Sequence, residues 1–497
     1  MNELISRFNK AVDRKQPWLG MMEEAYHYSI PNRNDFFDKT KGSKKNQDVY
    51  DSTAVVGVQR FATRIQSILV PPWRRWTTLV SGNAIPHDER EDVNRILANI
   101  TDEFFRHLDH SNFAVRSHES FQDLGVSTGA LLFHEGKGTE LFNFSSIPLS
   151  SLYLEEGPDG EVQTVWRKLS VSIRNIPGMW KDVRLTDTLK DMLSTSPDKE
   201  VELIEGTIYN GKDYDYVVLF KEAELVRRSF EISPWIVFRW STIPGEVYGR
   251  GPVLTVLPDI LTLNKVREYV LLNGAMNIAG MYTARNDGVL NPYTVEFAPN
   301  TILPVASNDR NNPSIRALEQ SGNFDLSQII ISDLQTNVKK ALFVDQLGPV
   351  DGAVRSATEI SVRNQELLQD IGGSFGRLQT EMVTKIVNRG VHILQKAGKI
   401  PNFRIDGEEV SLRHQSPLAK AQDQEDVLAF QQFLEIGGAL GPEVMMLGTK
   451  VEDAPSWLAK KLGLDPELIR SEGERMQIQQ QAAMAAQQQQ AAVSSEG

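Results

Sequence analysis

The chain has 497 residues, no cysteine and a formal net charge of −12. The length corresponds to roughly two to four domains, and the lack of cysteine excludes disulfides and thiolate metal sites. An acidic chain is poorly suited to wrapping nucleic acid, because phosphate neutralisation needs Lys and Arg, but it suits a surface that nucleic acid passes without adhering.

The first part of the chain is predicted to be helical. Apolar residues recur at helical spacing near the N-terminus until Pro31 ends the run. Asp51 or Ser52 can cap a second helix, which Pro71 stops. The helices expected before residue 130 cover residues 1–28, about 51–69, 89–110 and a segment starting near 114.

Between Ala130 and about Trp240 the pattern changes to short alternating runs, which indicate β-strands. Turn residues separate the runs, including the pair Asn210-Gly211. A helix near residues 183–193 interrupts them. The sequence therefore predicts an α+β fold, with its strands concentrated in this region.

A second helical part follows Gly251. One helix is expected to about Ala284, and another from about Leu326 to Phe343. The stretch between them is rich in Pro and Asn, which favours loops. It contains two short strand candidates, Thr294–Phe297 and Thr301–Val305.

The C-terminal part is predicted to contain a loop and then long helices. Residues 344–356 have the Gly, Pro and Asp content of a loop. Residues 358–396 form a helical pattern whose glycines at 372, 373 and 376 suggest a bend or close helix packing. Further helices are expected at 417–435 and 453–490, and the Gln- and Ala-rich end is either a frayed tail or part of a helical tube formed by several copies.

The segment Gly249-Arg250-Gly251 looks at first like a phosphate-binding loop. A Walker loop needs Lys at the position that Pro252 occupies here, and a dinucleotide fingerprint needs a third Gly where the chain has Leu254. The pattern favours a flexible turn, with Pro252 in the first turn of the helix that follows.

The segment Gly125-Val126-Ser127-Thr128-Gly129 matches the Gly-x-Ser-x-Gly pattern of serine hydrolases. That motif requires a strand before the serine and a helix after it, whereas this chain has a helical pattern before and an apolar run after. The sequence favours a helix end leading into a strand. A serine hydrolase using Ser127 remains the main alternative function.

No metal site or cofactor is predicted. His107, His110 and His118 could bind zinc, but they lie on or near a charged, solvated helix. No catalytic group of residues is evident, so we expect no enzymatic activity. We also expect no membrane segment and no signal peptide, because no apolar run is long enough.

Four phrases, with the order of the elements, carry a family resemblance: EEAYHYSIPNRNDF, VYDSTAVVGVQRFATRIQSILVPPWRRWTTL, VYGRGPVLTVLPDILTLN and VRSATEISVRNQELLQDIGGSFGRL. A long helix, a Pro/Asn-rich insert, a returning helix, a loop and a very long helix follow one another. The chain resembles the portal, or head-to-tail connector, proteins of short-tailed bacteriophages, over nearly its whole length.

This resemblance implies a portal fold made of an α/β wing, a two-helix stem, a small clip containing β-strands, a long bridging helix and a helical crown. Mapped onto this chain, the parts are the wing at 1–250 (β-rich from about 130), stem helices at 251–285 and 326–343, the clip at 286–325, a tunnel loop at 344–357, the bridging helix with a following β segment at 358–416, and the crown at 417–497. The clip has too few apolar residues to fold alone, so its strands are expected to pair with neighbouring subunits in a closed ring.

The resemblance also implies function and partners. It implies a homo-dodecameric ring at one capsid vertex, through which double-stranded DNA passes non-specifically during packaging and ejection. The expected partners are a terminase motor, a tail adaptor or other tail proteins, and the major capsid and scaffolding proteins. The expected location is the virion, with the host cytoplasm as the place of assembly. A non-viral helical scaffold or adaptor is a second alternative.

Three groups of residues are singled out on this basis. Those expected near the DNA channel are Lys339, Lys340, Asp345, Asp351 and Arg355, with the two lysines as brakes on phosphate. Those expected to dock partners through the clip are Thr294, Phe297, Thr301 and Val305. Those expected to form the wing–stem hinge are Gly249, Arg250, Gly251 and Pro252, where Arg250 could pair with an acid of a neighbouring subunit.

Overall fold

The computed structural model describes residues 2–37, 40, 42–86, 89–138, 140–279, 282–284, 305–307, 309, 311, 313–317, 324–344, 372–414, 417–438 and 454–462. The chain divides into two compact units. The large unit takes its residues from 1–17, 61–251 and 347–497, and the small unit from 18–60 and 252–346. Among the described residues, no helix combines the length and apolar character needed to cross a membrane.

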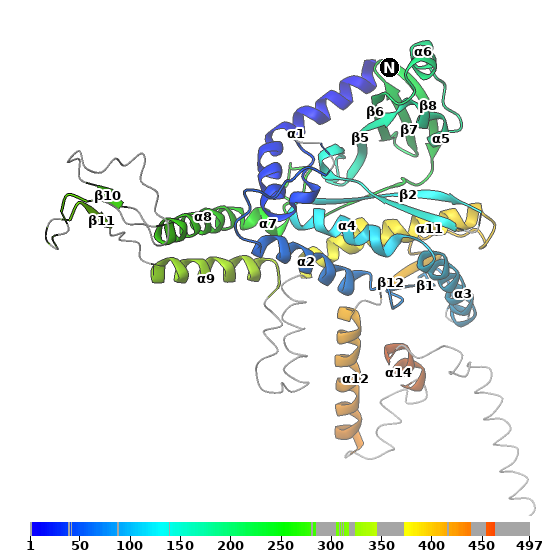
Figure 1. The fold of residues 1–497 in the computed structure, drawn as a ribbon. Helices are drawn as coiled ribbons and strands as arrows, with labels where there is room; N and C mark the ends of the chain where they lie inside the picture. Colours follow the sequence, from blue (N-terminus) through cyan, green and yellow to red (C-terminus); the bar gives the residue numbers. More distant parts are fainter. Residues whose placement is uncertain are drawn as a thin grey trace, which may run out of the picture. The chain divides into compact units, whose positions relative to one another are not determined.

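The large unit is built on antiparallel sheets (Figure 1). A five-stranded sheet has the order β4-β5-β6-β7-β8, a three-stranded sheet the order β3-β2-β9, and β1 pairs with β12. Gly211, with a φ of +98°, lies in the turn between β6 and β7, as the Asn-Gly pair predicts. The strands are β1 Thr77–Ser81, β2 Thr128–Lys137, β3 Glu140–Ser146, β4 Leu152–Glu156, β5 Val162–Ser172, β6 Glu200–Tyr209, β7 Tyr214–Phe220, β8 Ala223–Phe230, β9 Trp235–Arg239 and β12 Val410–His414.

Helices cover these sheets. The N-terminal part of α1 packs Phe8 and Ala11 onto the five-stranded sheet, against Trp166 and Val217. Helices α4 and α11 pack along the three-stranded sheet (Figure 1). The helical elements of the large unit are α3 Arg90–Asp109, α4 Phe113–Val126, η2 Leu149–Ser151, η3 Ile173–Asn175, α5 Ile176–Met179, α6 Asp187–Thr195, the π-helical segment η4 Gln379–Thr384, α11 Lys385–Lys396, α12 Pro417–Gly438 and α14 Ala454–Leu462.

The small unit is mostly helical. Helices α8 and α9 pack side by side, and a short antiparallel ladder joins β10 to β11 (Figure 1). Helices α1 and α2 contribute residues to both units. The elements are α1 Asn2–Ser29, η1 Pro31–Arg33, α2 Thr53–Leu69, α7 Pro252–Thr255, α8 Leu257–Ala279, β10 Tyr282–Ala284, β11 Ile315–Ala317 and α9 Phe324–Ala341.

The predicted α+β character and most predicted helices are confirmed. The predicted C-terminal boundary of the helix after Gly251 is wrong. The helix does not reach Ala284, because α8 ends at Ala279 and Tyr282–Ala284 forms a strand. Tyr and Thr fit a pleated strand well, and pairing with Ile315–Ala317 satisfies the backbone. The strand candidate Thr294–Phe297 lies outside the described residues.

The glycines before the π-helical segment do not mark close packing. A Cβ atom added at Gly372, Gly373 or Gly376 would meet no described atom within 4 Å. Close packing is therefore excluded as their role among the described residues. Only residues 372–396 of the predicted 358–396 helix are described, and they are helical throughout.

Candidate functional site

The two glycine-rich segments that resemble catalytic motifs pack against each other in the large unit. The Ser127 hydroxyl donates a hydrogen bond to the Gly249 carbonyl at 2.6 Å. The Gly249 N–H donates to the Thr128 hydroxyl at 3.0 Å, and the Gly251 N–H donates to the Val126 carbonyl at 2.9 Å. These bonds join the end of α4 to the segment before α7. We call this contact the glycine junction, defined by residues 125–129 and 248–251.

The glycines of the junction are required by close backbone approach. A Cβ atom on Gly251 would overlap the backbone of Gly125 and Leu124. A Cβ atom on Gly249 would lie 2.8 Å from the Arg239 Cβ and 2.9 Å from the Ser127 carbonyl oxygen. Neither glycine has a positive φ. Both are buried, so this segment is a packed, hydrogen-bonded joint and not the flexible turn that its composition favours.

Arg250 pairs within its own chain. Its guanidinium donates two hydrogen bonds to the Glu246 carboxylate, at 2.8 and 2.7 Å. Its backbone N–H donates to the Ser241 carbonyl at 2.7 Å. The acid that pairs with Arg250 is therefore Glu246 of the same chain, where an acid of a neighbouring subunit was considered. Pro252 begins α7, as predicted, and Pro258 is the second residue of α8.

Ser127 has the surroundings of a structural residue. It caps the C-terminus of α4 and precedes β2, the reverse of the strand-then-helix order of a nucleophile. Its side chain is fully buried, and its proton is committed to the Gly249 carbonyl. A buried hydroxyl bound to a backbone oxygen cannot attack a substrate. The geometry therefore gives no support to the serine hydrolase alternative.

A second joint, in the small unit, fixes the start of α2 to the helices α8 and α9. One Asp51 carboxylate oxygen accepts the Thr53 N–H at 2.8 Å, so Asp51, one of the two predicted capping residues, satisfies a donor at the start of α2, while the Ser52 carbonyl accepts the first intrahelical bond from Val56. The other oxygen accepts from the Gln335 side chain of α9 at 2.8 Å. From α8, the Asn264 side-chain oxygen accepts the Tyr50 N–H at 2.7 Å. We call this contact the α2 anchor, defined by Tyr50, Asp51, Asn264 and Gln335.

The predicted channel lysines lie at the end of α9. Lys340 is exposed and Lys339 is half-buried. The helix ends in a Schellman arrangement, in which the Val344 N–H donates to the Lys339 carbonyl at 2.8 Å and the Phe343 N–H to the Lys340 carbonyl at 3.0 Å. Phe343 takes the left-handed position with a φ of 58°.

Most of the other predicted site residues are not described. Asp345, Asp351 and Arg355 lie outside the described residues, as do Thr294, Phe297 and Thr301. Val305 is described, and it is half-buried outside any strand.

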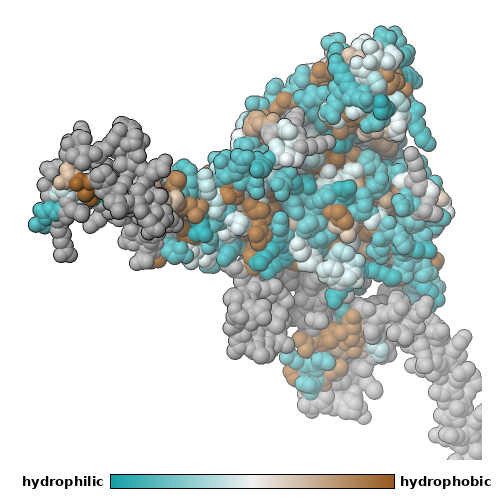
Figure 2. Space-filling model, in the orientation of Figure 1, coloured by the Kyte–Doolittle hydropathy of each residue, from teal (hydrophilic) through white to brown (hydrophobic). Residues whose placement is uncertain are grey.

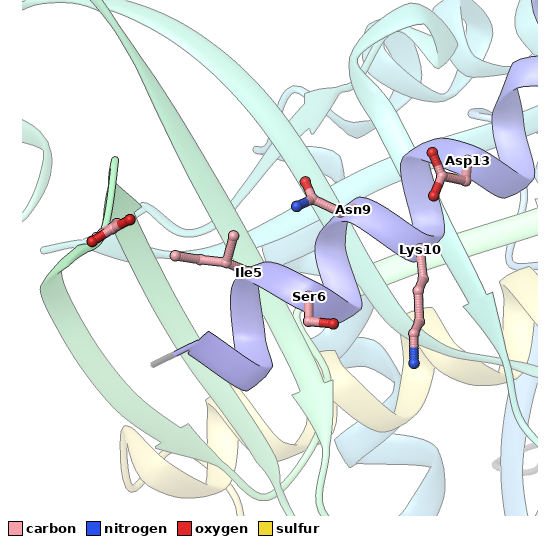
Figure 3. A pocket seen from close by; sticks show the side chains of 6 residues that line it. Ile5, Ser6, Asn9, Lys10 and Asp13 are labelled. Atoms are coloured by element: carbon pink, nitrogen blue, oxygen red, sulfur yellow. The ribbon is translucent and has the colours of Figure 1, made fainter.

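An open pocket of the large unit lies beside the N-terminal part of α1 (Figure 3). Its volume is about 470 Å³. The labelled polar side chains do not converge on one point, and Lys10 and Asp13 point apart (Figure 3). The lining residues are Ile5, Ser6, Asn9, Lys10, Asp13 and Glu222. This arrangement has no nucleophile paired with a base and so suggests no chemistry.

The histidines considered for zinc do not form a metal site. Within the described ranges, no three His, Cys, Asp or Glu residues are placed to hold an ion. His107 instead contacts the Glu103 carboxylate at 3.1 Å, one helical turn away. Burial and the neighbouring Arg106 lower its pKa.

Comparisons with known proteins identify the family. Residues 1–469 match the family described as bacteriophage head to tail connecting protein, and the chain belongs to this family. It is a structural component of the virion at the head–tail junction and not an enzyme.

Named relatives cover most of the chain. It is 22% identical to the probable portal protein of Bordetella phage BPP-1, over 97% of this chain and 92% of that protein. It is 21% identical to the portal protein of Escherichia phage T7, over 82% of this chain and 77% of that protein. A solved structure titled "Virion of native gene transfer agent (GTA) particle" aligns with a TM-score of 0.39 and 11% identity, over 84% of this chain and 91% of that one.

Proposed function

We propose that this chain assembles into a closed dodecameric ring that conducts double-stranded DNA through one vertex of the capsid. The family match over residues 1–469 carries this proposal. In this assignment the wing comprises residues 1–250, the stem helices 251–285 and 326–343, the clip 286–325 and the tunnel loop 344–357. The bridging helix and its β segment comprise 358–416, and the crown 417–497. The terminase and the tail adaptor would dock at the clip in turn.

Exposed apolar side chains support assembly with further copies. Six large apolar residues on α8 and α9 are at least 40% exposed in the single chain. Figure 2 shows apolar residues at the surface over these helices. Exposed apolar side chains gathered on two neighbouring helices are typical of an interface, and a head-to-tail contact repeated around a ring would cover them on every subunit. The residues are Tyr269, Leu271, Leu272, Met276, Ile329 and Ile330.

The α2 anchor supports the assignment of α8 and α9 as stem helices. Asn264 from α8 and Gln335 from α9 meet at the same short segment, Tyr50–Asp51. Leu342, just after α9, packs so closely on α2 that a Cβ atom at Gly57 would lie 2.5 Å from its side chain. These contacts hold the two helices as one rigid pair, as a load-carrying stem would need.

Charge supports a conduit that does not retain DNA. The subunit carries a net charge of −12, so a ring of copies repels phosphate overall. Lys339 and Lys340 end α9 next to the proposed tunnel loop, where a ring of lysines would slow DNA without stopping it. Asp345, Asp351 and Arg355 belong to the same proposed channel segment.

The oligomeric state tests the proposal. Native mass spectrometry of the full-length protein, with and without its scaffolding protein, should show a closed assembly near twelve times the 55.8 kDa mass of one chain. A ring with a different copy number would correct only the stoichiometry. A chain that stays monomeric under both conditions would contradict the proposed function.

A further inference from the structure

The helix of residues 372–396 contains a π-helical turn in its middle. Residues 379–384 form this turn, and α-helix lies on both sides of it. The Thr384 hydroxyl donates to the Gln379 carbonyl, five residues earlier, at 3.0 Å. A π turn is an uncommon insertion into an α-helix and is frequent at functional sites. Glu381 lies inside it and is only 7% exposed.

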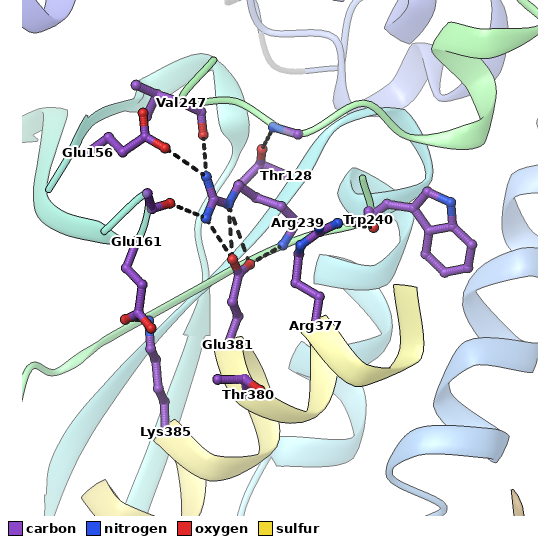
Figure 4. A network of polar contacts seen from close by, with 12 residues as sticks. Thr128, Glu156, Glu161, Arg239, Trp240, Val247, Arg377, Thr380, Glu381 and Lys385 are labelled. Carbon is purple, nitrogen blue, oxygen red and sulfur yellow. Dashed lines mark hydrogen bonds and ion pairs between the residues drawn. The ribbon is translucent and has the colours of Figure 1, made fainter. Parts of the chain in front are cut away.

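Glu381 is held by Arg239, the last residue of β9 (Figure 4). The Arg239 guanidinium donates to one carboxylate oxygen at 2.7 Å, and the Arg239 backbone N–H donates to the other at 2.8 Å. Arg239 is 3% exposed. Both oxygens of this buried carboxylate are bound, and its partner has the opposite charge. Moving Glu381 away from Arg239 would leave a buried charge without its partner, which is strongly unfavourable.

The same arginine holds the chain segment that leads to the glycine junction. Its guanidinium also donates to the Val247 carbonyl at 3.3 Å and to the Gly160 carbonyl at 2.8 Å. One turn before Glu381, Arg377 donates to the Trp240 carbonyl at 3.1 Å. The helix therefore bonds to Arg239 and Trp240 directly, and Arg239 in turn bonds to Val247 (Figure 4).

We propose that the Arg239–Glu381 pair is a latch that keeps this helix in its π register and couples that register to residues 239–251. An α-helix turns by about 100° per residue. If the π turn relaxed to α-helix, residues on one side of it would shift by one position and Glu381 would rotate away from Arg239. The helix thus has two discrete arrangements, and the buried pair selects one of them.

The latch concerns the helix register within the large unit, so it does not depend on the ring or on DNA. Its consequence is mechanical. A displacement of residues 372–378 along the helix axis would break the pair and release Val247 and Trp240, which precede the glycine junction.

Hydrogen exchange followed by mass spectrometry on the full-length protein tests the latch. Glu381→Gln keeps the side-chain volume and removes the charge. We expect exchange at least about tenfold faster in peptides covering 239–251 and 372–384, with the β6–β7 hairpin unchanged.

Deleting Thr380, which removes the extra residue of the π turn, should give the same pattern of faster exchange. Lys385→Gln is the matched control. Lys385 lies on the same helix as Glu381 and forms an ion pair at 3.9 Å with Glu161, which lies between β4 and β5. We expect its replacement to change neither peptide.

A doubly apolar variant, Arg239→Met with Glu381→Leu, covers the case in which the single variant does not fold. It removes the charges without leaving one unpaired, and we expect it to fold while both peptides still exchange at least about tenfold faster than in the wild type. Wild-type protection of residues 239–251 in the folded double variant would overturn the latch. So would a folded Glu381→Gln protein whose 239–251 peptide exchanges at the wild-type rate.

Discussion

Replacing Gly251 by Ala should destabilise the large unit substantially. The new Cβ atom would meet the Gly125 carbonyl and the Leu124 carbonyl, which are backbone groups and cannot rotate away as a side chain could. Overpacking a filled site costs about 1–3 kcal/mol, and the rigid neighbours place this variant at the upper end. The Gly251 N–H bond to Val126, at 2.9 Å, would lengthen as the segments separate.

Thermal unfolding of the purified protein measures this effect. A loss of about 2–3 kcal/mol lowers the Tm by roughly 3–4 °C for a unit of about 360 residues, at about 2.1 cal/mol/K of unfolding entropy per residue. Gly178→Ala is the control in the same unit, because a Cβ atom there meets nothing within 4 Å, and its Tm should stay within about 1 °C. A Gly251→Ala protein as stable as this control would refute the close-packing explanation of the junction.

Further predictions concern the helix end, a buried acid, the proposed stem surface and the proposed channel. Ser127→Ala removes the bond to the Gly249 carbonyl and should cost about 1–3 kcal/mol in a denaturant titration, with no loss of hydrolase activity because none exists to lose. Burial raises the pKa of Glu205 above its ordinary 4.5, so its contribution to stability is fully present below pH 4.5 and is lost as the pH rises through the raised value. Glu205→Gln should therefore gain stability relative to the wild type as thermal melts move from low to neutral pH. Ile329→Lys places a charge on a residue that is 66% exposed in the single chain, so the subunit should fold normally but assemble poorly in native mass spectrometry. Replacing both Lys339 and Lys340 by Ala should let packaged DNA slip back more often in a packaging assay.

Each of these predictions has a contradicting outcome. Esterase activity in the wild type that disappears in Ser127→Ala would restore the hydrolase alternative. A constant stability difference between Glu205→Gln and the wild type at every pH would show that Glu205 has an ordinary pKa. Normal rings from Ile329→Lys would remove this face from the interface. Wild-type packaging and retention of DNA by the double lysine variant would end the proposed brake role.

Local signals in the sequence predicted the local structure well. Asp51 caps α2 because Asp accepts the N–H groups of a helix start, and that preference is visible in a single residue. Pro252 begins α7 as predicted, because Pro is favoured in the first turn of a helix. The order helix, Ser127, strand was also predictable, because helical and strand patterns flank the residue.

The contacts between distant segments could not be predicted. Gly251 looks like a turn glycine, and nothing near it in the sequence shows that the Gly125 backbone fills the space of its side chain. Asn264 is one of three asparagines in α8, and nothing in the sequence marks it as the one that accepts the Tyr50 N–H in the α2 anchor. The π turn is invisible because apolar spacings of three and four residues around Met382 fit α-helix and π-helix alike.

Electron microscopy of the purified full-length protein tests the central claim most directly. The account predicts closed rings with a central channel about as wide as duplex DNA. In such rings α8 and α9 of each subunit would contact the next subunit through Tyr269, Leu272 and Ile329. Particles without a ring, both alone and with the scaffolding protein, would contradict the account.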